Sequence, residues 1–179
     1  MDVPLPIEAP RRSARLATTP RLRLSPSVRR AVLTVHIIAS VGLLGDCAAV
    51  LAINVRAAAT GDPALAAASY DLLAMFGVVF GIPLSFTALG TGLVLGLGTK
   101  WGVLRHRWVT AKLVLLVTVI LAGALVLGPA TAAMRDGAGN GNQTLLILAS
   151  AYDVLVLALA TGLSVFKPGR RRDRPPHRR

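Results

Sequence analysis

Five ionisable residues stand inside long apolar runs, and they are the residues of this chain best suited to chemistry. They are His36, Asp46, Asp71, Lys112 and Asp153. A charge within a bilayer costs about 2.5 to 3.5 kcal/mol on insertion scales, so such residues usually face the interior of a helix bundle. There an imidazole can ligate a metal or move a proton, and a carboxyl can relay protons.

The elements that must position these residues are four apolar runs, from about 31 to 55, 69 to 97, 108 to 127 and 143 to 166. Each is long enough to cross a membrane, because about 20 helical residues at 1.5 Å each span a core of roughly 30 Å. Backbone groups find no water there, and the Leu- and Val-rich runs lack the alternation of barrel strands. The predicted fold class is therefore all-α: a polytopic membrane protein built as a four-transmembrane-helix bundle.

The charge pattern predicts how this bundle is oriented. The chain is 54% hydrophobic and 16% charged, with a mean hydropathy of +0.62, and its net charge of +12 comes from tails and loops. Most basic residues outside the runs fall in three segments: Arg11, Arg12, Arg15, Arg21, Arg23, Arg29 and Arg30 before the first run, Lys100, Arg105 and Arg107 between the second and third, and Lys167, Arg170, Arg171, Arg172, Arg174, Arg178 and Arg179 after the fourth. The other two loops hold only Arg56 with Asp62, and Arg135 with Asp136. Because cytoplasmic loops carry the Lys/Arg excess, we expect a multi-pass plasma-membrane protein with both termini in the cytoplasm.

Two basic tails flank the transmembrane domain, which we place at residues 31–166. Residues 1–30 and 167–179 are rich in Arg and Pro and poor in apolar residues, so we expect disordered cytoplasmic tails. Their expected partners are anionic lipids of the inner leaflet, at about 1 kcal/mol per basic residue. Nucleic acid is not expected, because no aromatic residues interleave with the arginines to stack on bases. A homo-oligomer or another membrane protein is a further candidate partner.

Small residues indicate how the helices pack, because in lipid close approach of backbones drives association. The pairs Gly77 with Gly81 and Gly92 with Gly96 lie on the second helix together with Pro83. We therefore expect this helix to be kinked and closely packed. A short echo joins Ala-Ser-Tyr-Asp-Leu at 68–72 to Ser-Ala-Tyr-Asp-Val at 150–154, which fits either a duplicated two-helix unit or chance.

His36 and Lys112 each lie about one turn inside the cytoplasmic boundary, on the first and third helices. They are candidates for one inner-leaflet pocket, and the alternative is that Lys112 snorkels to the interface while His36 only packs. At 100° per residue, the residues that share the His36 face of the first helix are Ser40, Leu43, Cys47 and Asn54.

Asp46 and Asp153 fall near the middle of the bilayer by the same count, without a cation at their depth. Each must be protonated, hydrogen-bonded or open to water, so they are candidates for a proton relay. The lone Cys47 allows no intramolecular disulfide, and no metal-binding motif is present in the sequence.

Two segments carry a resemblance to a known family: "LGTGLVLGLGTKWGVLRHRWVTAKLVLLV" at 89–117 and "VHIIASVGLLGD" at 35–46. They resemble an actinobacterial family of uncharacterised integral membrane proteins with four helices, and the resemblance covers most of residues 30–127. It implies the fold and brings no activity. Relatives often carry a His at the end of the third helix, where this chain has Leu127-Gly128-Pro129, so a site that needs that His would be absent here.

The positions of His36 and Lys112 give a more distant resemblance, to the four-helix membrane protoporphyrinogen oxidases. That resemblance implies His36 as an axial haem ligand and Lys112 as a cation for a haem propionate.

Three functions therefore remain open, and whether the protein is an enzyme is left undecided. The first is an integral membrane protein of unknown activity that acts through partners. The second is a haem- or tetrapyrrole-binding redox protein with a pocket at His36 and Lys112. The third is a proton-linked carrier that uses Asp46 and Asp153.

Overall fold

The described part of the chain forms helices long and apolar enough to cross a membrane. A computed structural model describes residues 24–97, 107–137 and 141–166. Within them the four candidate spans are Pro26–Ala59, Pro63–Leu97, Val109–Arg135 and Asn142–Ser164. The predicted fold class, an all-α bundle of four membrane-spanning helices, is confirmed.

The first span is one helix, α1 (Pro26–Ala59). It begins where the Ser25 side chain accepts a hydrogen bond from the Val28 N–H at 3.3 Å, and Pro26 follows in the first turn, where a missing N–H costs nothing. The helix thus starts before residue 31 and includes the last residues of the segment predicted as a tail. The division into two disordered tails and a transmembrane domain remains a prediction.

The second span is continuous but changes its winding in the middle. It comprises α2 (Pro63–Phe76), the π-helical segment η1 (Gly77–Gly81) and α3 (Ile82–Leu97). In η1 the Ile82 N–H bonds to the carbonyl of Gly77, five residues earlier. The proline ring of Pro83 lacks an N–H and would clash with the carbonyl four residues before it in a regular α-helix. The wider π turn relieves this clash, and it stands where we expected a kink.

The third span repeats this design, and the fourth does not. The third comprises α4 (Arg107–Ala122), η3 (Gly123–Leu127) and α5 (Gly128–Arg135), and in it the Gly128 N–H bonds to the Gly123 carbonyl just before Pro129. The fourth span is a single helix, α6 (Asn142–Phe166).

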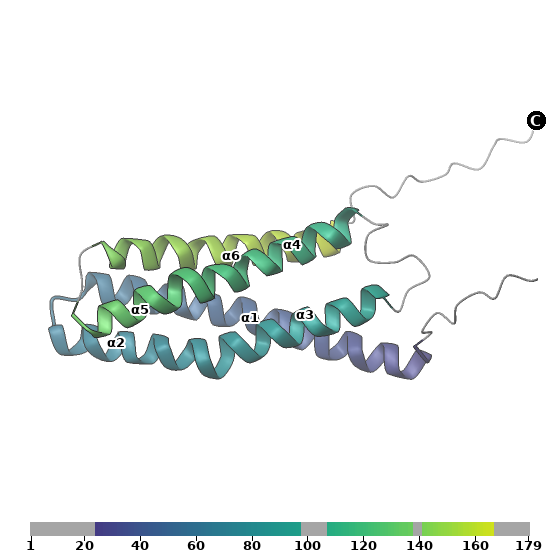
Figure 1. Ribbon diagram of the computed structural model, residues 1–179, viewed down its shortest axis with the longest axis horizontal. Coiled ribbons are helices and arrows are strands. Elements are labelled where there is room, and N and C mark those ends of the chain that lie inside the picture. The colour runs from purple at the N-terminus through teal and green to yellow at the C-terminus, as the bar shows by residue number, and fades with distance from the viewer. Residues whose placement is uncertain (1–23, 98–106, 138–140, 167–179) are drawn as a thin grey trace, which may run out of the picture.

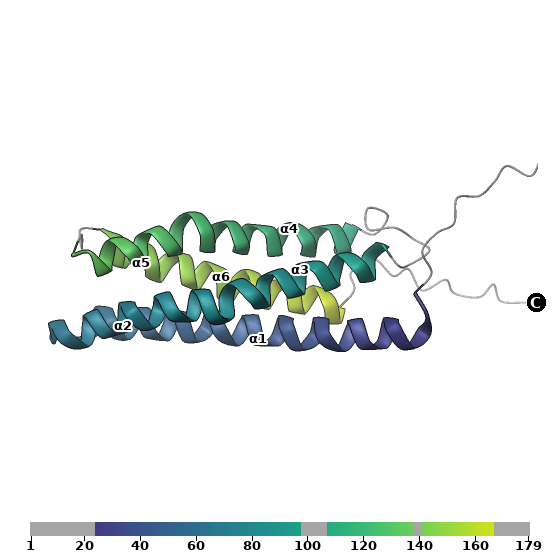
Figure 2. The ribbon, with the colours of Figure 1, turned by 60° about the horizontal axis from the view of Figure 1, so that its bottom comes forward.

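The four spans alternate in direction and form a closed bundle (Figure 1). Helix α1 packs against α2, α3 and α6, while α4 packs against α6 and α2 against α5. One end of the bundle, which we call the terminal end, holds Pro26, Leu97, Arg107 and Phe166. The opposite end holds the two short connections and is called the short-loop end. The rotated view shows the same arrangement (Figure 2).

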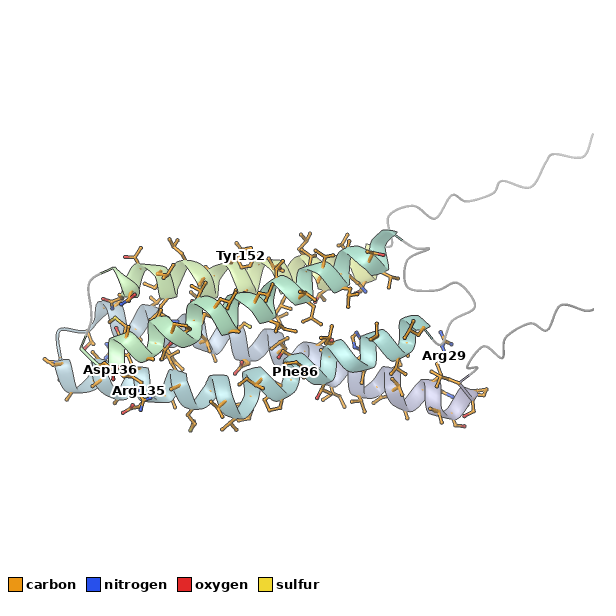
Figure 3. All side chains as sticks on the ribbon, viewed as in Figure 1. Arg29, Phe86, Arg135, Asp136 and Tyr152 are labelled. Carbon is orange, nitrogen blue, oxygen red and sulfur yellow. The ribbon has the colours of Figure 1, made fainter. Side chains whose placement is uncertain are left out.

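Two small clusters form the interior of this bundle. One contains Leu43, Cys47, Val119, Val156 and Leu157, and the other contains Ala57, Tyr70, Leu73, Ala130 and Leu146. Large apolar side chains on each of the four spans are also exposed, and many of them point outward in Figure 3, as expected for a surface that faces lipid.

The contributions that buried and lipid-facing residues of α6 make to stability can be measured separately. Leu146 is 1% exposed and Leu148 is 63% exposed on the same helix. We expect Leu146→Ala to lower the free energy of unfolding by about 2 to 4 kcal/mol, because it leaves a cavity between helices. Leu148→Ala is the matched control and should change stability little. Unfolding in mild detergent, followed by circular dichroism, measures both, and equal losses would contradict this packing.

Candidate functional site

His36 joins α1 to α3. Its Nδ1 lies 3.1 Å from the Ala88 carbonyl oxygen and 3.0 Å from Thr91 Oγ1. A carbonyl can only accept, so Nδ1 is assigned the hydrogen and Nε2 is the acceptor of the neutral ring. The Thr91 hydroxyl donates to the Thr87 carbonyl at 2.6 Å, which leaves its oxygen able to accept from His36. This imidazole therefore makes an interhelical hydrogen bond within the membrane.

Glycine at position 92 gives the His36 ring its space. A Cβ atom at Gly92 would lie 3.1 Å from Cε1 of His36, which is tighter than an ordinary contact. The close packing predicted for the glycines of the second span thus applies to Gly92 and also to Gly81, but a Cβ at Gly77 would meet nothing within 4 Å.

Lys112 lies on α4, partly buried, and is close enough for its charge to act on the His36 ring. The structure therefore brings these two predicted site residues into one region of the bundle. That they bind a ligand there stays a prediction.

A second group of polar residues lies farther from the terminal end than His36, between α1 and α6. Asn54 is 2% exposed, Ser150 1% and Asp153 2%. The Asn54 Nδ2 donates to Ser150 Oγ at 3.4 Å, and Ser150 Oγ donates in turn to the Leu146 carbonyl at 2.6 Å. We call Cys47, Asn54, Ser150 and Asp153 the polar seam.

Three oxygen atoms in the interior of the bundle are buried acceptors without a hydrogen-bond partner among the described residues. They are Oδ1 of Asp46, Asn54 and Asp153. An unpaired buried polar atom costs about 1 to 3 kcal/mol, and an unpaired charge costs more. Each of the two carboxyls therefore has a buried oxygen that no donor among the described residues satisfies.

Cys47 lies within electrostatic reach of both acids, which brings the two predicted relay residues near one thiol. The carboxyl of Asp46 faces the second span, where a Cβ at Gly81 would lie 3.3 Å from its Oδ2. From the Asn54–Ser150 contact, the helical rise puts Asp153 about 4.5 Å and Asp46 about 12 Å toward the terminal end. The acids thus differ in depth by about 7 Å, although the sequence placed them at one level.

Asp71 has a different role from the other acids in the runs. Its Oδ1 accepts from Arg135 Nε at 2.7 Å, and the side chains are 67% and 49% exposed. This ion pair links α2 to the end of α5 and, being exposed, contributes at most about 1 kcal/mol. The sequence did not predict it, because Arg135 was assigned to a loop far along the chain.

The two Tyr-Asp echoes have opposite environments. Tyr70 is buried and Asp71 exposed, whereas Tyr152, labelled in Figure 3, is exposed and Asp153 is buried. One residue corresponds to 100° of helix rotation, so the shared dipeptide is turned by about this angle between α2 and α6. The echo therefore does not mark two equivalent sites.

Other predicted features lie outside the described residues or leave no trace within them. The Arg-rich segments 1–23 and 167–179 and the loop at 98–106 are not described. Among the described residues there is no group of three or more His, Cys, Asp or Glu side chains that could hold a metal ion.

Four spanning helices around a polar seam define an integral membrane protein. The chain belongs to the family described as predicted integral membrane protein (DUF2269), whose model matches residues 30–166. Neither the curated proteins nor the solved structures contain a match to it. The resemblance to an uncharacterised membrane family is thus confirmed, and the resemblance to protoporphyrinogen oxidases finds no support in these comparisons.

The contact between His36 and Gly92 gives a direct test of this interface. We expect Gly92→Val to displace the imidazole from Ala88 and to lower stability by about 1 to 3 kcal/mol through overpacking. Gly90→Val is the control, because a Cβ at Gly90 meets nothing within 4 Å. Detergent unfolding compares the two variants, and equal stability would show that the His36 ring does not occupy this space.

Proposed function

We propose that this protein is a proton-linked carrier whose path follows α1 and the polar seam. The observation that carries the proposal is Asp153, a carboxyl that is 2% exposed and has an oxygen without a hydrogen-bond partner among the described residues. It lies near the middle of α6, so it falls near the middle of the bilayer. An ionisable group at that depth is costly and typically marks a proton or ion pathway.

The spacing of polar residues along α1 supports a path. His36, Asp46, Cys47 and Asn54 all lie on this helix, and from His36 to Asn54 the helix rises about 27 Å, close to the thickness of a hydrocarbon core. The offset of about 7 Å between Asp46 and Asp153 is longer than a hydrogen bond, so transfer between them requires an intermediate donor such as water.

The orientation belongs to the same proposal. We place the terminal end in the cytoplasm and the bundle in the plasma membrane, because the Lys and Arg residues concentrate at that end of the spans. The basic tails would then lie beside the anionic inner leaflet.

Action through a partner is a second candidate, favoured by one face of α1. Gly45, Ala48 and Ala52 are exposed there and follow helical spacing. Small residues let a neighbouring helix come close, so a second copy or another membrane protein could pack on this face.

Proton flux into liposomes tests the carrier. We expect purified protein, reconstituted with a pH-sensitive dye inside and a potassium diffusion potential, to admit protons faster than protein-free liposomes do. Asp153→Asn should reduce this flux to the protein-free level, because an amide cannot release a proton. Asp136→Asn, the same change at an exposed residue, is the control. Equal flux in all three proteins, or none in the unmodified protein, would reject the carrier.

Cysteine labelling tests the orientation in intact cells. In a Cys47→Ala background, Gly139→Cys should react with a membrane-impermeant maleimide, because it falls in a connection predicted to lie outside. Gly169→Cys should react only after lysis. The reverse pattern would place the terminal end outside and contradict the predicted topology.

A further inference from the structure

The second and third spans contain the same local device. Each has a π-helical segment that starts at a glycine, Gly77 or Gly123, and each has a proline six residues after that glycine, Pro83 or Pro129. Proline removes one backbone hydrogen bond and the π turn rearranges several others, so both segments are weak points in otherwise regular helices. Neither α1 nor α6 has a π segment in its described residues.

The two π segments lie at the same depth on neighbouring helices. The Asp71–Arg135 ion pair fixes the register of the two spans at the short-loop end. Counting from it along the helical rise, η1 lies about 9 to 15 Å and η3 about 12 to 18 Å toward the terminal end. Figures 1 and 2 agree, since the α2–α3 and α5–α4 junctions lie at a similar place along the bundle.

Packing does not explain why these segments begin with glycine. A Cβ atom at Gly77 or Gly123 would meet nothing within 4 Å, whereas one at Gly81 or Gly128 would meet an oxygen at 3.3 Å. Where no neighbouring atom would exclude a side chain, what glycine adds is conformational freedom of the backbone, which a bending point needs.

The halves on either side of this level are held differently. On the short-loop side, α2 and α5 pack together and carry the Asp71–Arg135 ion pair. On the terminal side, α3 and α4 pack less against each other and diverge toward Leu97 and Arg107 (Figure 1), while α3 stays packed against α1, to which His36 joins it, and α4 stays packed against α6. The carboxyl of Asp46 lies against Gly81 of η1, so movement at η1 would move one wall of its surroundings.

We infer that η1 and η3 are paired hinges, about which α3, moving together with α1, and α4, moving together with α6, swing apart while the packing of α2 against α5 keeps those two helices together. The swing opens the terminal end of the bundle and gives Asp46 and the polar seam access from that side. In the proposed carrier, this motion is how protons, or a solute that moves with them, reach the path from one side. The role of the hinges in access rests on the proposed carrier function, whereas the motion itself does not depend on it.

Distances between spin labels in liposomes test the motion. In full-length protein with Cys47→Ala, one labelled pair is Val94→Cys on α3 with Val114→Cys on α4, and the other is Leu72→Cys on α2 with Ala132→Cys on α5; all four sites are exposed. By double electron–electron resonance we expect at least two distance populations for the α3–α4 pair and one for the α2–α5 pair. A single narrow population for α3–α4, or equal breadth in both pairs, would overturn the hinges.

Substitutions then locate the motion. Pro83→Ala with Pro129→Ala should restore regular α-helix and reduce the α3–α4 pair to one population. If that protein does not fold, Gly77→Ala with Gly123→Ala provides the test without steric conflict, and it should shift the populations in the same direction. The control is Gly45→Ala with Gly90→Ala, where a Cβ is equally free but no π segment is present. Equal effects of the two glycine pairs would overturn the assignment to η1 and η3.

The same substitutions, made for the flux measurements in protein that keeps Cys47, separate the hinge from the carrier. Asp153→Asn should lose proton flux and keep both distance populations. Flux that continues in a substituted protein with one α3–α4 population would overturn the role of the hinges in access and leave the carrier standing. Two populations without any flux in the unmodified protein would reject the carrier, and with it the role in access, while the motion stands.

Discussion

The absence of water around the backbone is the constraint on which this structure depends. Within a bilayer every N–H and C=O must find its partner inside the chain, so the apolar runs form continuous helices. Even the prolines inside the second and third spans do not interrupt them. At Pro83 and Pro129 the helix widens into a π segment in place of a break, with i to i+5 bonds that close on Gly77 and Gly123. The constraint that forces helices therefore also creates the two weak segments within them, η1 and η3.

In lipid, hydrophobicity does not decide which face of a helix is buried, because the surroundings are as apolar as the core. Close approach and polar contact decide it. Helix α1 has both, since its buried residues include Ala39, Cys47 and Asn54, and its His36 reaches the backbone of α3. Accordingly α1 contacts the second span along one side and α6 along another. Its position in the bundle thus follows from the few residues that distinguish it from a plain apolar helix.

Run length and hydropathy were enough to predict the four helices, because these properties are local. The start of α1 at Pro26 was missed, since the cap formed by Ser25 outweighs the polarity of the residues that follow it. Contacts between distant segments could not be predicted, because the ion pair of Asp71 with Arg135 depends on the register of two spans. The opposite exposure of Asp71 and Asp153 could not be predicted either, because it depends on how far each helix is rotated about its axis. The sequence did place His36 near Lys112 in depth, but the acceptor at Ala88 is a backbone oxygen, which leaves no signal in residue type.

The unpaired oxygens of the interior indicate function more strongly than stability. Replacing buried polar or ionic groups with well-packed apolar ones is often neutral or stabilising, and a bundle this rich in Leu and Val has the residues to fill such a space. Asn54 and Asp153 nevertheless occupy fully buried positions, and each has an acceptor without a partner among the described residues. Local rules are usually broken at sites where a protein works. The seam between α1 and α6 breaks the rule of polar satisfaction, and the π segments beside it break helical regularity at the level of Asp46. The two departures lie at neighbouring depths, since Asp46, which faces Gly81 of η1, is offset by about 7 Å along the bundle from Asp153 in the seam.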